Sequence, residues 1–135
     1  MKKLVIGLLV LFVLAACAGG ASASISGQWK LVSYGPAAGQ KPAVADVDTN
    51  IEFTSDGKLN GNVGCNGFGG DYKVDGATLT FGPVISTMMF CEGPVGEQEM
   101  ATIAVFQKSA AFVLDANTLT ITSADGNSVI MLARK

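Results

Sequence analysis

Apolar and polar residues alternate with a period of two over much of the chain after residue 25. In residues 28–34, Trp29, Leu31 and Ser33 fall on one face of an extended segment, and Tyr34 falls on the other. Alternation of this kind is typical of a half-buried β-strand, because successive side chains of a strand point to opposite faces. The pattern therefore predicts a chain made mainly of strands.

Turn residues separate these alternating segments at regular intervals. The dipeptides Asp56-Gly57, Asp75-Gly76 and Asp125-Gly126 each lie between two strand-like runs. Asp-Gly suits the positive φ angles of tight hairpin turns. Residues 115–117 supply a fourth, weaker turn, whereas residues 35–48 are expected to form a long loop. We expect a mainly β protein with about eight strands, arranged as a small antiparallel barrel or a strongly twisted sheet.

One segment, residues 96–108, lacks turn residues and is rich in helix formers. We predict a single α-helix near 96–108 that covers the sheet. Its apolar side chains share one arc, which we expect to pack on the core: Met100, Ile103, Ala104 and Phe106. Glu97 and Glu99 are expected to be exposed near the start of this helix, where the helix dipole favours acidic side chains.

The first 16 residues have the pattern of a secretory signal: Lys2-Lys3, an apolar run, and small residues before Cys17. Roughly 13 apolar residues are too few to cross a bilayer, which takes about 20. Residues 14–17 (LAAC) resemble a bacterial lipobox, which implies that Cys17 carries a lipid. The alternative is an ordinary cleavage site that leaves Cys17 as a spare thiol. We expect a signal at 1–16, a lipidated flexible tether at 17–26 and a folded domain at 27–135.

The lipobox resemblance also implies a location. The lipid would attach the protein to the outer membrane on its periplasmic face, or alternatively to the outer face of a cytoplasmic membrane. The lipid is then the membrane contact, because the domain itself is acidic and anionic lipid would not attract it.

Composition narrows the classes of function. Hydrophobic residues make up 49% and charged residues 15% of the chain, which favours a folded domain. The net charge of −2 and the lack of a basic cluster argue against a nucleic-acid partner. The chain has no His, which excludes His-based triads and His-ligated metals. Residues 46–50 imitate the start of a calcium loop, but Ile51 and Gly57 replace its Gly and Glu. We therefore expect no catalytic residues, no cofactor and no metal.

Cys65 and Cys91 remain as thiols if Cys17 is lipidated. An exported domain lies where disulfides form and persist, so two remaining cysteines favour one structural bridge. The alternative is a redox or metal site, but the pair lacks close C-x-x-C spacing.

Candidate binding residues gather in two segments. The first segment, residues 60–70, is rich in glycine. It lacks the lysine of a phosphate-binding loop, so tight corners of a barrel explain its glycines best. Its asparagines could bind a ligand or cap turns. The second segment is residues 87–95, beside Cys91. The candidate binding residues are Asn60, Asn62, Asn66, Thr87, Met88 and Met89.

Three stretches resemble the META/HslJ family of bacterial envelope lipoproteins: residues 27–32 (GQWKLV), 59–72 (LNGNVGCNGFGGDY) and 79–91 (LTFGP through STMMFC). The similarity extends through residues 97–132. It implies a lipocalin-like β-barrel with one helix, and an association with heat shock, novobiocin resistance or secretion. Residues 92–96 (EGPVG) depart from the family pattern, which has helix-compatible residues there.

These observations lead to two functional hypotheses. The first is a monomeric, non-catalytic, lipid-anchored envelope domain that binds a protein partner or a small lipophilic ligand in stress or antibiotic tolerance. The alternative is a periplasmic inhibitor of a hydrolase, a lysozyme or protease, that presents residues 87–95 as a rigid loop.

Overall fold

The computed structural model describes residues 24–135. Within these residues ten strands and one helix follow one another: β1 (Gly27–Pro36), β2 (Lys41–Pro42), β3 (Asn50–Phe53), β4 (Lys58–Asn62), β5 (Gly67–Asp75), β6 (Thr78–Phe81), β7 (Ile85–Ser86), α1 (Gly93–Val105), β8 (Ser109–Asp115), β9 (Thr118–Ser123) and β10 (Ser128–Arg134). The predicted signal and Cys17 lie outside the described residues.

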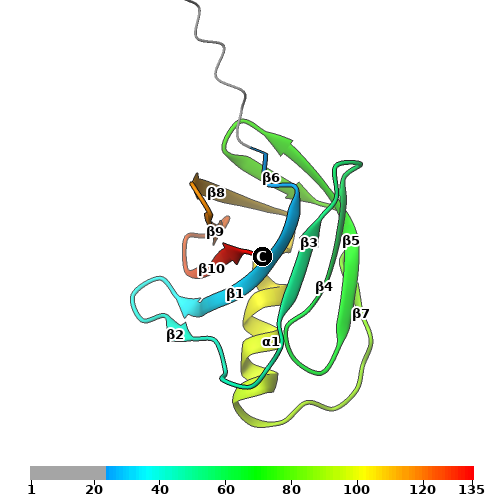
Figure 1. The fold of residues 1–135 in the computed structure, drawn as a ribbon, viewed down its shortest axis with the longest axis vertical. Helices are drawn as coiled ribbons and strands as arrows, with labels where there is room; N and C mark the ends of the chain where they lie inside the picture. The colour runs from blue at the N-terminus through cyan, green and yellow to red at the C-terminus, as the bar shows by residue number, and fades with distance from the viewer. Residues whose placement is uncertain (1–23) are drawn as a thin grey trace, which may run out of the picture.

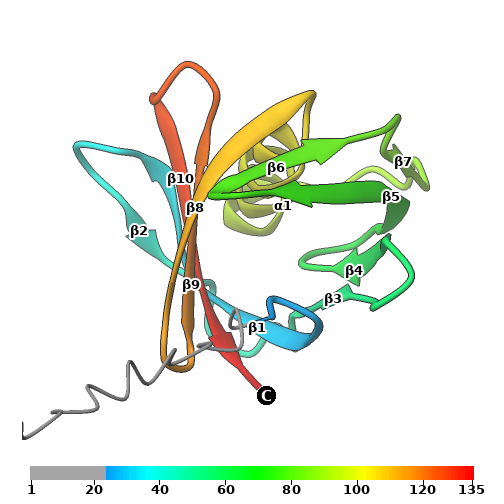
Figure 2. The same cartoon turned by 90° about the horizontal axis from the view of Figure 1, so that it is seen from above.

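Eight of these strands close into an antiparallel barrel (Figures 1 and 2). Their order is β10-β9-β8-β6-β5-β4-β3-β1, and pairing of β1 with β10 completes the ring. The short strands β2 and β7 add to β1 and β5 without being part of the ring. The predicted mainly β barrel with a single helix is confirmed, and the three Asp-Gly turns each connect neighbouring strands.

A β-bulge in β1 changes which side chains enter the core. The register against β10 shifts between Leu31 and Ser33, so Val32 is the extra residue. Trp29 and Leu31 point inward as predicted, and after the bulge Tyr34 is buried in place of Ser33. The prediction that Tyr34 lies on the opposite face is therefore wrong, because a strict period of two does not continue through a bulge.

The folded region includes Ile25, which lies within the tether expected at residues 17–26. Ile25 is 3% exposed and belongs to the core, and its carbonyl oxygen accepts a 2.8 Å hydrogen bond from Trp29 Nε1. The guanidinium of Arg134 lies over the Trp29 ring, with its Cζ atom 4.2 Å from the ring centre. The expected boundary between residues 26 and 27 is thus too late, since Ile25 already packs against the barrel.

Aromatic rings occupy the centre of the barrel. Phe106, which follows α1, lies with its ring centre 5.3 Å from Phe81, 5.7 Å from Phe68 and 6.3 Å from Phe53. Phe53 in turn packs edge-on against Tyr72 at 5.1 Å. A barrel of eight strands is just wide enough for side chains to fill. A binding surface on this domain is therefore expected on the outside.

The helix lies three residues earlier than predicted at both ends. It begins at Gly93, because Pro94 sits in the first turn, where a missing N–H removes no helical hydrogen bond. It ends at Val105, and the positive φ of Lys108 turns the chain into β8. In the part of the chain that the structure describes, α1 is too short to cross a membrane.

The side of the helix that faces the barrel matches the predicted one only in part, because Ile103 and Phe106 pack on the core as expected. It packs against β1, β9 and β10, and its buried residues are Gly96, Gln98, Glu99, Thr102 and Val105. Met100 is 70% exposed and Ala104 is exposed, so the predicted apolar arc does not pack on the core as a whole. Glu99 is 6% exposed, and the expectation that it is exposed is wrong. Glu97 is exposed, as predicted.

Candidate functional site

The loop between β7 and α1 is held in place by one buried side chain. Asn66, which precedes β5, is 4% exposed. Its Oδ1 accepts hydrogen bonds from Met89 N at 2.7 Å and from Thr87 Oγ1 at 2.8 Å. Its Nδ2 donates to Met89 O at 3.0 Å. The Asn66 amide thus pairs with both backbone groups of Met89, as a neighbouring strand would.

Glu99 of α1 holds Asn66 in turn. The Oε2 atom of Glu99 accepts a hydrogen bond from Asn66 N, and its Oε1 atom accepts one from Asn66 Nδ2, both at 2.6 Å. Gly64 makes room for this carboxylate, because a Cβ at that position would lie 2.8 Å from Glu99 Oε2. Among the described residues no basic side chain forms an ion pair with Glu99, so these hydrogen bonds replace its lost hydration.

A disulfide between Cys65 and Cys91 fixes the far end of the same loop. The predicted structural bridge is present, and it closes a segment of 26 residues. Three alternate residues are therefore attached to the segment around Asn66. Thr87 is attached through its hydroxyl, Met89 through its backbone and Cys91 through its sulfur. We call residues 87–91 the pinned loop.

The residues between these attachments are presented to solvent. Met88 is 95% exposed and Phe90 is 86% exposed, while Met89 is 61% exposed despite its fixed backbone. Exposed apolar side chains that gather in one place are uncommon on a soluble domain and mark interaction sites. The pinned loop and α1 are the walls of a groove of about 690 Å³, whose helix wall includes Met100, Ile103 and Ala104.

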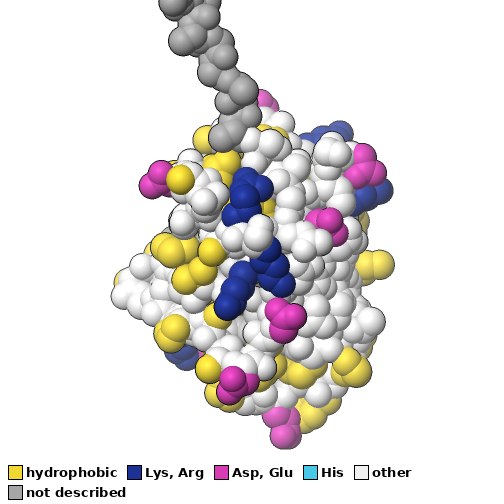
Figure 3. All heavy atoms as spheres, in the orientation of Figure 1, with side chains coloured by type: hydrophobic (Ala, Val, Ile, Leu, Met, Phe, Trp, Pro, Cys, Tyr) yellow, Lys and Arg dark blue, Asp and Glu magenta, His cyan; other side chains and the backbone are white. Residues whose placement is uncertain are grey.

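Apolar side chains gather at the end of the molecule that carries this groove. Hydrophobic side chains, together with a few Asp and Glu side chains, appear at the lower end of the visible face, the end where the β7–α1 connection lies, whereas several Lys and Arg side chains gather nearer the middle of that face (Figure 3). The described chain enters β1 at the upper end in the same orientation (Figure 1). The pinned loop and the start of the folded domain therefore lie at opposite ends.

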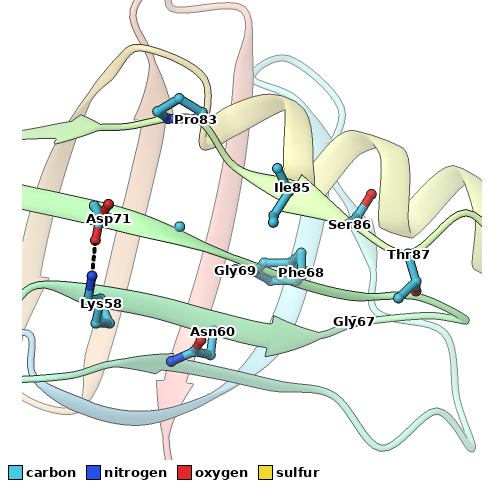
Figure 4. Close-up of a pocket in the computed structure, with 11 residues that line it drawn as sticks. Lys58, Asn60, Gly67, Phe68, Gly69, Asp71, Pro83, Ile85, Ser86 and Thr87 are labelled. Carbon is cyan, nitrogen blue, oxygen red and sulfur yellow. Dashed lines mark hydrogen bonds and ion pairs between the residues drawn. The ribbon is translucent and has the colours of Figure 1, made fainter.

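A second groove, of about 640 Å³, lies on the other side of β7 (Figure 4). Its floor is the glycine-rich part of β5, and Lys58, Asn60, Pro83 and Ile85 are among its lining residues. Lys58 Nζ lies 2.5 Å from Asp71 Oδ1. The hydrogen bond and the charge of Asp71 raise the pKa of Lys58. Both partners are more than half exposed, so this ion pair contributes little to stability.

The six candidate binding residues separate into distinct places. Asn60 lines the glycine-floored groove, and Met88 and Met89 line the groove beside α1. Thr87 lines both grooves, because it follows β7, which separates them. Asn66 is a buried support of the pinned loop. Asn62 accepts a 3.1 Å hydrogen bond from Gly64 N, which is the turn-capping alternative given above.

Phe90, Met100 and Ile103 contribute to the groove but were missed as binding residues. The available signal for Phe90 was its spacing: it stands two residues after Met88, so an extended segment would expose both side chains on the same face. Within residues 24–135 no cluster of three or more His, Cys, Asp or Glu side chains is arranged to hold a metal ion. In the segment that imitates a calcium loop, Asp48 Oδ1 lies 3.4 Å from Lys135 Nζ. On the helix, Glu97 Oε1 lies 2.5 Å from Lys41 Nζ.

By its architecture, the domain is a closed barrel of eight antiparallel strands with one helix and a disulfide-bonded loop. Residues 23–135 match the family model of the META domain, so the chain belongs to the META domain family. The family resemblance read from the three sequence stretches is thereby confirmed.

Solved structures share the fold. An NMR structure of a protein from Burkholderia xenovorans aligns with a TM-score of 0.66 at 21% identity, covering 82% of both chains. A second NMR structure gives 0.62 at 25% identity, covering 78% of this chain and 86% of the other. A crystal structure of a DUF4847 family protein from Bacteroides vulgatus gives 0.57 at 18% identity, covering 82% and 93%. No curated protein matches the chain.

Proposed function

We propose that this META domain is a non-catalytic binding domain of the bacterial envelope, attached to a membrane through a lipid on Cys17, and that the pinned loop is its recognition surface. The observation that carries the proposal is the arrangement of residues 87–91, in which alternate residues are fixed and Met88 and Phe90 are exposed.

The fixed backbone suits the loop for binding. A loop that is already ordered loses little conformational entropy when a partner covers it, so more of the contact energy remains as affinity. Aromatic and methionine side chains are enriched at the centres of protein interfaces. We therefore expect a protein partner with an apolar pocket that accepts Phe90.

The position of the loop agrees with a lipid anchor. The folded domain starts at the end opposite the pinned loop (Figure 1). A lipid at residue 17 would leave the loop directed away from the membrane that holds the protein. The partner would then be another component of the envelope rather than the anchoring bilayer.

Complementation of a deletion strain tests this function. The strain is challenged with heat and with novobiocin, the stresses that the family resemblance implies. We expect the wild-type chain and Val113→Ser to restore tolerance, and Phe90→Ser to fail although it reaches the membrane in equal amount. Val113 is the matched control, because it is an exposed apolar residue (66%) on β8.

Two results would contradict the proposal. Full rescue by Phe90→Ser would remove the pinned loop from the function, and a deletion strain without a phenotype would remove the role in stress. The anchor is checked separately, by mass spectrometry of the N-terminal peptide and by fractionation of Cys17→Ser, which we expect to leave the membrane.

The pinned loop also favours the second candidate, a hydrolase inhibitor. An inhibitory loop must keep its shape inside an active site, and residues 87–91 are held at every second position. Titration against lysozymes and proteases tests this function directly. Inhibition at micromolar concentration that Phe90→Ser removes and Val113→Ser retains would establish it, and no inhibition by the wild-type chain would reject it.

A further inference from the structure

Three methionines line the groove beside α1. Met88 and Met89 come from the pinned loop, and Met100 comes from the middle of the helix. They are 95%, 61% and 70% exposed. The core therefore does not use these side chains, and their thioether sulfurs are accessible. Met131, the remaining methionine of the described chain, lies on β10 and does not line this groove.

The backbones that carry the three thioethers are fixed. Asn66 bonds both the N–H and the carbonyl of Met89, the disulfide fixes Cys91, and Met100 belongs to a regular helix. Methionine side chains are unbranched and have three rotatable bonds, so they adapt to a common centre once their backbones are held. This gives one groove three adaptable sulfur donors on a rigid frame.

Other strong donors for a soft metal are missing from this groove. The chain has no His, and Cys65 and Cys91 are consumed in the disulfide. Both oxygens of Glu99 are engaged by Asn66. Soft thioether ligands select soft ions such as Cu⁺, whereas Ca²⁺ takes oxygen ligands. We propose that Met88, Met89 and Met100 form a thioether site for a soft monovalent cation, Cu⁺ in the cell.

This inference goes beyond the proposed function and does not rest on it. Replacing methionine by leucine removes the sulfur and keeps an apolar side chain of similar volume. Met→Leu variants therefore lose a metal site while keeping an apolar docking surface. Phe90→Ser has the opposite effect, because it changes the docking surface and leaves all three sulfurs in place.

Silver is the probe of choice for the experiment. Ag⁺ stays monovalent in air, so no reductant is needed that would open the Cys65–Cys91 disulfide. The purified full chain carries Cys17→Ser, so that no free thiol competes for silver, and has ¹³C-labelled methionine methyl groups. It is titrated with silver nitrate in chloride-free buffer and followed by NMR. We expect the methyl signals of Met88, Met89 and Met100 to shift together and to saturate at one ion per chain. The signal of Met131 should not shift, which makes it an internal control.

Variants complete the test. Each single Met→Leu change at 88, 89 or 100 should weaken Ag⁺ binding by at least about tenfold, since even outer-shell partners of a metal contribute about 10–100-fold. The triple variant should lose binding, and Met131→Leu should bind as wild type does. Cu⁺ supplied in acetonitrile should produce the same shifts.

Four results would overturn the site. They are wild-type affinity in the triple variant, equal shifts of Met131, the same shifts with Zn²⁺, and no shift at millimolar Ag⁺. Because the methyl signals are measured on a chain that keeps all three methionines, a Met→Leu variant that fails to fold does not decide the outcome.

Discussion

Replacement of Asn66 by alanine is the sharpest test of how the pinned loop is held. The change removes four side-chain hydrogen bonds: two to the backbone of Met89, one from Thr87 and one to Glu99. The bonds to Met89 and Thr87 are only part-buried, so water can replace them in the variant. The bond to Glu99 Oε1 is buried and has no such replacement.

The expected loss of stability comes mainly from Glu99 Oε1, which stays buried and loses the hydrogen bond from Asn66 Nδ2. Hydrogen bonds to charged groups contribute about 1.5–3 kcal/mol, and an unsatisfied buried group costs a further share of its desolvation. Asn66→Ala should therefore lower the free energy of unfolding by about 3 kcal/mol. That is a large part of a typical stability of about 5–15 kcal/mol.

Urea unfolding measures this loss. Trp29 is the only tryptophan and is fully buried, so its fluorescence reports the loss of the core. Asn62→Ala is the matched control, because the Asn62 side chain makes one local bond, to Gly64 N, and its loss should cost about 0.5–1 kcal/mol. Hydrogen exchange of residues 87–91 should quicken in the Asn66 variant alone. Equal stability of the two variants would refute the reasoning.

Two further changes test the same region by denaturation. Cys65→Ser/Cys91→Ser should lower the free energy of unfolding by about 3.5 kcal/mol, because the bridge closes 26 residues of the unfolded chain; no change in the urea midpoint would contradict this. Gly96→Ala should lose about 1–3 kcal/mol, since its Cβ would overlap the Cys91 carbonyl oxygen. Gly39→Ala meets nothing within 4 Å and should change stability by less than about 0.5 kcal/mol.

The strands could be predicted because their signals are local. An Asp-Gly pair needs only its own backbone to form a turn, and residues on either side then pair across it. The bulge at Val32 has no such signal, because it depends on the register that β10 imposes from the other end of the chain. The inward position of Tyr34 followed from that register and could not be read from residues 28–34.

The binding surface could be predicted only in part. Met88 and Met89 were selected because they stand beside Cys91, and they do line a groove. Asn66 was selected as a ligand-binding residue, but it is buried and bonds Glu99, which lies 33 positions further along the chain. A contact at that separation leaves no pattern in a single sequence. Met100 was assigned to the core because a helix is expected to bury its apolar side.

The helix α1 buries polar side chains instead, because backbone groups at the lower end of the barrel take their hydrogen bonds from it. Gln98 is fully buried, its Nε2 donates to Val63 O at 2.6 Å, and its Oε1 accepts from Val44 N at 2.7 Å. These two backbone groups belong to loops whose backbone would otherwise go unpaired. The polar side of α1 therefore completes the hydrogen bonding of the barrel end, and the apolar side remains for the groove.

Gln98→Met separates this explanation from simple hydrophobicity. Burial of a methionine favours the variant, but an unsatisfied Val63 O and Val44 N cost about 1–3 kcal/mol each. We expect a net loss of about 2 kcal/mol in urea unfolding. Thr102→Val is the matched control, because Thr102 Oγ1 bonds only Gln98 O in its own helix, and it should cost less than about 1 kcal/mol. A Gln98→Met variant as stable as wild type would mean that the barrel end does not require the polar side of α1.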